Sequence, residues 1–492
     1  MFRPNCGEKS VEIALDQVKS GSRFSKAFWV IWLIELWERF GYYGAQAILA
    51  LYFVSQLGYS ESKSFYVFGS FSAFVYGFIW IGGWIGDKYL GAKRTMVVGA
   101  IVLMLSYAGL ALADHQTIFY ALAGIVVGNA LFKANPSSLI SKMYAKGDPA
   151  LDGAMTLYYM SVNVGSMISM ALTPIIAANY GWTKAFWVCA IGLFLGLGNY
   201  FVCRRALDTV GTEVDQNALN LNRLALVVGG SLLAILGIAQ LLNHTQICNW
   251  IVYVVVTSAF LYFVKIAFSL KGITRTRMFV AFILILQAVL FFVLYNQMPT
   301  SLTFFAVHNI NNHVLGFNIP PAEYQVLNPI VIVIMAPVLA WLYNRYPATH
   351  ATKFCIGMSL CAGAFLALAI PQFTAVDGLA SPGWMVLSYF LQSVGELLIS
   401  GLGLAMVAEL CPVNMSGFVM GIWWLAMMLA GPIGAWVGAL TAPPAGVEHL
   451  STLDSMQLYA HVFMKIGLIT GLTAAAMWLS RPVLNRLLAR HH

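Results

Sequence analysis

Apolar stretches of about 20 residues recur from one end of the chain to the other, and short polar segments separate them. A helix needs about 20 apolar residues to cross the roughly 30 Å hydrocarbon core of a bilayer. The pattern therefore predicts an all-α polytopic membrane protein. The fourteen predicted transmembrane helices cover residues 27–54, 65–87, 94–113, 117–142, 153–178, 183–204, 221–243, 248–269, 277–306, 322–344, 352–371, 382–410, 416–441 and 457–480.

The distribution of basic residues predicts the orientation of these helices. With a cytoplasmic N-terminus, the tails and cytoplasmic loops, with adjoining helix ends, hold 22 of the 27 Lys and Arg residues. The periplasmic loops hold two, Lys63 and Lys184, and the other three lie within spans. Because basic residues gather in cytoplasmic loops, this 11-to-1 ratio predicts a bacterial inner-membrane protein with both termini in the cytoplasm.

The composition excludes a soluble protein. Of the 492 residues, 60% are hydrophobic and 9% are charged, whereas soluble proteins carry about 25% charged residues. The net charge of +8 does not indicate nucleic-acid binding, because the basic residues lie in short loops between apolar runs. The seven cysteines lack metal-ligand spacing, so we expect no metal site. The first 26 residues contain no apolar stretch, and we expect no cleavable signal peptide.

The longest cytoplasmic polar stretch, residues 204–220, follows the sixth span. Six spans precede it and eight follow, and two repeated halves are typical of secondary transporters. The two spans at 221–269 carry almost no charge, and we interpret them as an extra, peripheral pair. The predicted organisation is an N-terminal six-helix bundle (1–205), a linker with the extra helices (206–275) and a C-terminal six-helix bundle (276–492).

Three charged residues, Glu35, Glu38 and Arg39, lie deep in the first span, in the segment ELWERFGYYG. A charge at mid-bilayer costs at least about 2.5–3.5 kcal/mol, so such residues need a reason. Their i, i+3, i+4 spacing places them on one helical face, and Gly41 and Gly44 let another helix or a ligand approach closely. A structural ion pair is the simplest alternative, but it does not account for two carboxylates beside one guanidinium. We expect the crowded carboxylates to bind and release protons.

Two opposite charges occupy corresponding helices of the predicted halves. Lys133 lies in GNALFKANPSS near the centre of the fourth span, and Glu396 lies in QSVGELLISGLG. Glu396 is on the tenth helix when the extra pair is not counted, and the tenth helix corresponds to the fourth. A lysine that snorkels to the interface is an alternative, although the depth of Lys133 argues against it. A zwitterion lying across the midplane would satisfy both charges.

Other polar positions have two interpretations each. Asn163 in YYMSVNVGS and Asn328 in LNPIVIVIMAP either bind a ligand or join helices by hydrogen bonds. The loop GGWIGDKYLGAKR mixes acidic and basic residues, which predicts a cytoplasmic latch between moving helices, with positive-inside anchoring as the alternative. The latch residues are Asp87, Lys88, Lys93 and Arg94.

The segment ELWERFGYYG resembles the ExxER-x-x-YYG signature of the proton-dependent oligopeptide transporters, a family of the major facilitator superfamily. The segments GDKYLGAKR, FKANPSS, YYMSVNVGS, LNP and GELLISGLGLAMVA fall in the order that this family shows. The resemblance covers nearly the whole chain and is closest to bacterial dipeptide and tripeptide permeases. It implies the major facilitator fold and the proton-coupled import of dipeptides and tripeptides by alternating access.

The resemblance also implies residue roles. Arg39 and Lys133 would bind the peptide carboxylate, and Glu396 would bind the amino terminus. Glu35 and Glu38, with Arg39, would couple transport to protons. The other peptide-binding residues that it implies are two asparagines that would bond the peptide backbone, Asn163 and Asn328, and the pocket residues Tyr42, Tyr43, Tyr76 and Trp423.

The chain departs from the family pattern at two places. Many members have arginine where this chain has Gln46 and glutamate where it has Asn296, a pair that resembles a periplasmic gate. Both positions are neutral here, so we expect periplasmic closure to depend on other contacts. The usual Trp-Phe-Leu followed by Ser or Thr is Trp423-Trp424-Leu425-Ala426 here, which predicts different side-chain preferences.

Several other functions compete with this interpretation. A related secondary transporter or an exporter of a non-peptide substrate would share the fold, although Glu396 favours zwitterions. A membrane-embedded enzyme would need a nucleophile, a metal or an acid–base cluster, and we predict no catalytic residue. No nucleotide-binding Gly-Lys-Ser/Thr loop is present, so we expect a proton gradient and no cofactor. We expect a monomer that contacts the lipid bilayer, dipeptides, tripeptides and peptide-like drugs, and not nucleic acid.

Overall fold

A computed structural model describes residues 24–489, except residues 146–147, 149, 315, 347, 413–414, 445–446 and 448–449. The first part contains α2 (Lys26–Ser55), α3 (Glu61–Gly77), α4 (Ile79–Trp84), the π-helix η1 (Ile85–Tyr89), α5 (Ala92–Ala111), α6 (Ile118–Lys133), α7 (Asn135–Ser141), α8 (Ala150–Tyr180) and α9 (Trp182–Cys203). The middle part contains the 3-10 helix η2 (Arg204–Leu207), α10 (Glu213–Gln216), α11 (Leu221–Asn243) and α12 (Thr245–Ser269).

The last part begins at residue 272 and is again almost entirely helical. It contains α13 (Gly272–Tyr295), the π-helix η3 (Met298–Leu302), α14 (Thr303–Asn309), the strands β1 (His313–Val314) and β2 (Phe317–Asn318), the 3-10 helix η4 (Pro321–Val326), α15 (Leu327–Arg345), α16 (His350–Ala369), the 3-10 helix η5 (Ile370–Phe373), α17 (Gly383–Leu410), α18 (Ser416–Ala439) and α19 (Thr452–Ala489). The two strands form a small antiparallel hairpin that pairs His313 with Asn318.

The prediction of an all-α polytopic membrane protein is confirmed. Twelve segments of the described chain are helices that are long and apolar enough to cross a bilayer. Two more helices, α2 with 30 residues and α17 with 28, have spanning length and pack among them. The predicted span 277–306 is interrupted, because Pro299 cannot continue the helix and Thr300 leaves the helical region at φ −115° and ψ −105°.

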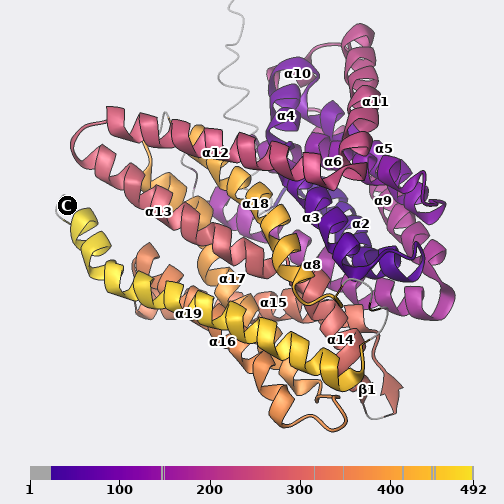
Figure 1. Ribbon diagram of the computed structural model, residues 1–492. Coiled ribbons are helices and arrows are strands. Elements are labelled where there is room, and N and C mark those ends of the chain that lie inside the picture. Colours follow the sequence, from indigo (N-terminus) through magenta and orange to yellow (C-terminus); the bar gives the residue numbers. More distant parts are fainter. Residues whose placement is uncertain are drawn as a thin grey trace, which may run out of the picture.

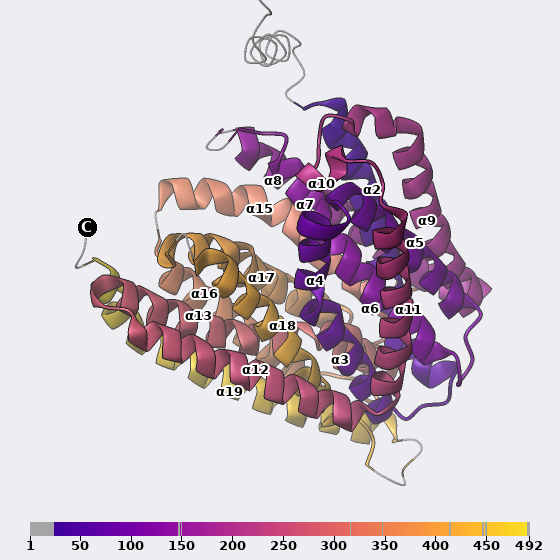
Figure 2. The same cartoon turned by 90° about the horizontal axis from the view of Figure 1, so that it is seen from above.

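The helices form two groups with α3 and α18 between them (Figures 1 and 2). On one side α2 packs against α8 and α9, and α5 packs against α6; on the other side α16 packs against α17 and α19. The groups meet most extensively where α3 packs along α18. Gly69 and Gly431 allow this close approach, since a Cβ at Gly69 would lie 2.6 Å from the carbonyl oxygen of Gly431.

The helices α11 and α12 separate from each other after a short turn. α11 packs mainly against α6, whereas α12 crosses toward α18 and α13, as Figure 2 shows. Their spanning stretches are only 17% and 22% buried within the chain. Most of their apolar surface therefore faces lipid rather than protein.

Candidate functional site

The charged residues of α2 form a buried cluster. Glu35 and Glu38 are fully buried and Arg39 is 3% exposed. Arg39 donates a short hydrogen bond from Nε to Glu38, and its Nε lies 3.5 Å from Oε1 of Glu35. Arg39 also donates from Nη2 to Oδ1 of Asn129 on α6, at 3.1 Å. The guanidinium therefore joins both carboxylates to the neighbouring helix.

Lys133 belongs to this cluster. Its Nζ lies 3.9 Å from Oε1 of Glu35, so the side chain points toward α2 rather than snorkelling to an interface. The helix is interrupted here: α6 ends at Lys133, and α7 begins at Asn135, which Pro136 follows. Asn135 bridges the break, donating to the carbonyl of Leu131 at 2.6 Å. Lys133 thus lies at the end of α6, where Asn135 stabilises the interruption between the two helices.

The two carboxylates of α2 are held unequally. Glu38 is bound tightly by Arg39, whereas Glu35 has the longer ion pairs to Arg39 and Lys133. The hydroxyl of Tyr158 on α8 also interacts with the Glu35 carboxylate. Glu35 therefore shares its contacts among three helices, whereas Glu38 depends mainly on Arg39.

A second polar cluster lies in the second helix group, on α15 and α17. Asn328 at the start of α15 donates from Nδ2 to Oε2 of Glu396 at 2.7 Å and to Oγ of Ser393 at 3.1 Å. Asn328 is 6% exposed and Ser393 is fully buried. Basic residues form ion pairs with the carboxylates of the first cluster, but no basic residue in the described part of the chain forms an ion pair with Glu396. Its carboxylate is oriented by Asn328 and is available for a cation.

Tyrosines from both helix groups surround Glu396. The carboxylate interacts electrostatically with Tyr43 on α2, Tyr76 on α3, Tyr159 on α8 and Tyr295 on α13. Tyr159 is 46% exposed. Side chains from both helix groups therefore lie within electrostatic range of the Glu396 carboxylate.

Other predicted site residues lie differently. Tyr42 is 2% exposed and packs under the Arg39 guanidinium, 5.3 Å from ring centre to Cζ. Asn163 donates to the carbonyl of Tyr159 on its own helix. Trp423 is buried against Phe292 rather than in the space around Glu396.

The aromatic residue beside Tyr76 is Trp424, whose ring stacks on it at 6.3 Å and 11°. Sequence reasoning missed this residue, as well as Tyr159, Tyr295 and Asn129. Asn129 had a signal, since an amide one helical turn before Lys133 lies on the same face. The tyrosines had none, because tyrosine is also common in the aromatic belts at both membrane interfaces. Gly41 and Gly44 contact Tyr107, Thr173 and Cys189, so they serve helix packing rather than ligand approach.

Contacts between the two groups gather at one end of the molecule, which we call the closed end; it contains the turn between α2 and α3. Gln325 donates to the carbonyl of Ala47 at 2.9 Å, and Ser72 donates to Oδ1 of Asn296 at 3.3 Å. A hydrogen bond of 2.6 Å joins Nε2 of His308 on α14 to Glu61 on α3. These contacts close this end without a charge at residue 46.

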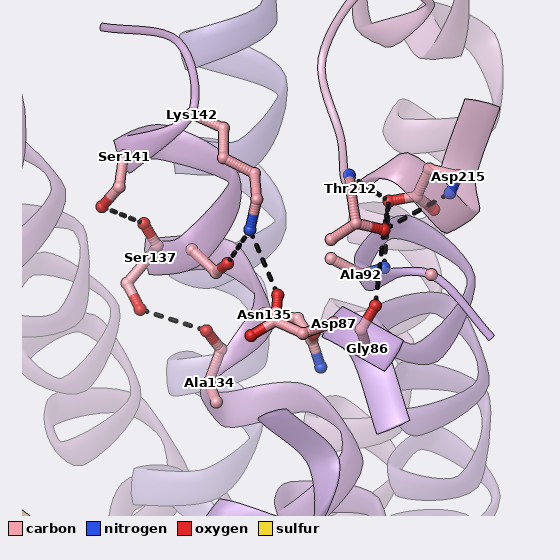
Figure 3. Close-up of polar contacts among 12 residues, drawn as sticks. Gly86, Asp87, Ala92, Ala134, Asn135, Ser137, Ser141, Lys142, Thr212 and Asp215 are labelled. Atoms are coloured by element: carbon pink, nitrogen blue, oxygen red, sulfur yellow. Dashed lines mark hydrogen bonds and ion pairs between the residues drawn. The ribbon is translucent and has the colours of Figure 1, made fainter. Parts of the chain in front are cut away.

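Three of the four predicted latch residues, Asp87, Lys93 and Arg94, bind partners within the first helix group and the linker, and Lys88 is exposed. Asp87 pairs with Nζ of Lys142 at 3.1 Å, and Figure 3 shows the two side chains pointing at each other. Nζ of Lys93 donates to the carbonyl of Leu207 at 2.9 Å, and Arg94 donates to carbonyls of the segment before α11. The loop thus connects η1 to α7 and to the linker.

Asp215 anchors this linker. Its Oδ2 accepts from the backbone N–H of Ala92 at 3.0 Å and of Thr212 at 2.9 Å (Figure 3). The Thr212 hydroxyl in turn donates to the carbonyl of Gly86 at 3.4 Å. These bonds hold the segment after α9 against the start of α5, and so attach it to the first helix group.

Comparisons with known proteins identify the relatives of this chain. The sequence profile of the POT family matches residues 93–451. Dipeptide and tripeptide permease B of Aeromonas hydrophila is 47% identical over 472 residues, covering 94% of each chain. The crystal structure of tetrameric PepTSo2 matches with a TM-score of 0.84 at 37% identity, covering 94% of this chain and 99% of that one. A structure described as giving insight into substrate recognition in proton dependent oligopeptide transporters matches with a TM-score of 0.81 at 36% identity, covering 93% and 99%.

Proposed function

The chain belongs to the POT family, and from this premise we propose that it is a proton-coupled symporter that imports dipeptides and tripeptides by alternating access. The observation that carries the proposal is the placement of opposite charges in the two helix groups. The first group presents the cations Arg39 and Lys133, and the second presents Glu396, oriented by Asn328. A small zwitterion bound between the groups would pair with both. The protein is thus a transporter and not an enzyme.

The ends of the peptide define the substrate class. Its carboxylate binds Lys133 and Arg39, and its amino group binds Glu396. An extended chain spans at most about 3.3–3.6 Å per residue, so a dipeptide is roughly 7 Å long and a tripeptide roughly 10 Å. Side chains then point into the space lined by Tyr43 and Tyr76, which favours broad recognition of sequence and strict recognition of length.

The proton is carried by the carboxylates of α2, and the gradient replaces any cofactor. Glu35 shares Arg39 and Lys133 with the arriving peptide carboxylate. When the peptide takes these cations, Glu35 loses its ionic partners and takes up a proton, since a buried carboxylate without an ionic partner is costly. Glu38 keeps Arg39 in place through its tight pair. Peptide and proton are then bound together.

Alternating access follows from relative motion of the two bundles, 24–205 and 276–489. The closed end holds the hydrogen bonds between them, and we assign it to the periplasmic side on the basis of the basic loops at the opposite end. Both termini are then cytoplasmic, in the inner membrane of a bacterium. Each chain carries both halves of the site, so a monomer is the functional unit.

The experiment that tests this function is uptake into liposomes. A labelled dipeptide should accumulate when an inward proton gradient is imposed and should only equilibrate when it is not. A labelled free amino acid and a tetrapeptide serve as controls for length. Equal uptake with and without the gradient would contradict proton coupling, and equal uptake of the tetrapeptide would contradict recognition of both ends.

A further inference from the structure

An apolar groove runs along α11, away from the transport site. It has a volume of about 580 Å³ and lies between α11 and the face formed by α4, η1 and α6. Figures 1 and 2 both show α11 beside these helices. Its walls include Trp84, Leu131, Leu226 and Ile238, and the glycines of α11 widen it. A Cβ at Gly230 would meet no atom within 4 Å, so the groove has room at this point.

A polar pocket adjoins the groove at Tyr89. This pocket, of about 220 Å³, is lined by Arg94, Asn217, Asn220 and Arg223, and Tyr89 lines both spaces. The Arg223 guanidinium lies over the Tyr89 ring at 5.3 Å and donates to the Tyr89 carbonyl at 3.1 Å. A site with two arginines therefore lies next to the apolar groove.

An aromatic pair marks the boundary between the two parts. Trp84 stacks on Tyr89 at 6.3 Å and 13°, and Tyr89 is covered by Arg223. Tryptophan and tyrosine gather at the depth of lipid headgroups. The apolar wall thus corresponds to the acyl chains of a lipid, the aromatic pair to the interface, and the guanidinium groups to the headgroup.

The lining of the pocket is positively charged. Arg94 donates to the carbonyls of Leu90, Val214 and Asn217, which carry no net charge. No carboxylate lines the pocket, and within the described chain none forms an ion pair with Arg94 or Arg223; Asp215 lies nearby but binds backbone N–H groups. Two guanidinium groups without a direct carboxylate partner are complementary to a phosphate.

We propose that this groove binds one anionic phospholipid of the cytoplasmic leaflet, with an acyl chain along α11 and the phosphate at Arg94 and Arg223. The lipid would fill the space that separates α11 from α4 and join the extra helix to the first bundle. This site is separate from the peptide site and does not depend on the transported substrate. It depends on the proposed orientation only for the choice of leaflet.

Native mass spectrometry of the purified full chain tests the proposal. Phosphatidylglycerol and phosphatidylcholine with identical acyl chains are titrated separately, and the first should bind more tightly. Arg223→Gln should reduce phosphatidylglycerol binding about fivefold and leave phosphatidylcholine unchanged, because one charge near the surface is removed. Gly230→Leu fills the groove and should abolish the bound lipid.

Gly229→Leu is the matched control. It adds the same side chain one position away, where a Cβ also meets no atom within 4 Å, and Gly229 does not line the groove. It should bind lipid like the unmodified protein. Thermal unfolding of each variant is followed by circular dichroism, and Ala234→Leu, which also lines the groove, replaces Gly230→Leu if that variant does not fold.

Three results would overturn the proposal. Equal binding of the two lipids by the unmodified protein would mean that the arginines do not select charge. Unchanged lipid binding in both groove-filling variants would place the lipid elsewhere. A change in oligomeric state on filling the groove, with lipid binding unaffected, would make the groove a contact for a second copy of the chain.

Discussion

Gly431→Ala should drive α3 and α18 apart and shift the protein away from the conformation described here. The two helices belong to different bundles and touch through Gly69 and Gly431. A Cβ at Gly431 would lie 2.4 Å from the carbonyl oxygen of Gly69 and 3.0 Å from Cβ of Ala73. Ordinary contact begins near 3.4 Å, so the helices would have to separate by about 1 Å.

The expected magnitude follows from this overlap. Forcing an extra methyl group into a packed contact costs about 1–3 kcal/mol. If the contact exists only while the closed end is closed, the substitution shifts the conformational equilibrium by the same amount, about 5- to 150-fold. Peptide uptake should fall, because the protein then returns less often to the conformation in which the closed end is closed.

Double electron–electron resonance can measure this shift. Spin labels are placed at Gln56, after α2, and at Phe373, before α17, both of which are exposed. The background lacks native cysteines and is first shown to retain uptake. Gly431→Ala should increase the population with the longer distance between the labels.

Gly421→Ala on the same helix is the control, because a Cβ there would meet no atom within 4 Å. This variant should keep the distance distribution of the unmodified protein. If Gly431→Ala also keeps that distribution and its thermal stability is unchanged, the α3–α18 contact accommodates the added methyl group without a change of conformation. The reasoning from close packing would then be refuted.

Three further predictions concern the polar residues. Glu35→Gln and Glu38→Gln should each abolish gradient-driven accumulation of a dipeptide, and Glu38→Gln should spare exchange between equal pools; undiminished uphill transport by both variants would refute a role in coupling. Acetylating the amino end of a dipeptide should weaken competition strongly in the unmodified protein, since an unpaired buried charge costs about 3–5 kcal/mol; in Glu396→Gln it should matter much less, and equal weakening in both would show that Glu396 does not bind the amino end. Gln46→Ala should reduce uptake only slightly, by an amount equivalent to the loss of one membrane hydrogen bond of about 0.6 kcal/mol. A hundredfold loss of uptake at normal expression would contradict this.

The sequence by itself determined the class of protein and the approximate positions of its spans. Each span is recognised from its own residues, because a helix in lipid pairs its backbone groups internally and needs only length and apolarity. The shared face of Glu35, Glu38 and Arg39 was also predictable, since it depends on the 3.6-residue period of one helix. The depth of Lys133 and Glu396 in their spans marked them as functional candidates for the same local reason.

Tertiary structure decided which of these residues meet. Glu35 pairs with Lys133 across two helices, Asn328 orients Glu396, and Trp424 rather than its neighbour reaches Tyr76. The contacts of the closed end could not be read from the chain either. Within a bilayer, apolar side chains gain little by exchanging lipid for protein, so helix positions depend on small residues and a few hydrogen bonds between distant segments. Those contacts are set by the approach of whole helices, which local periodicity does not encode.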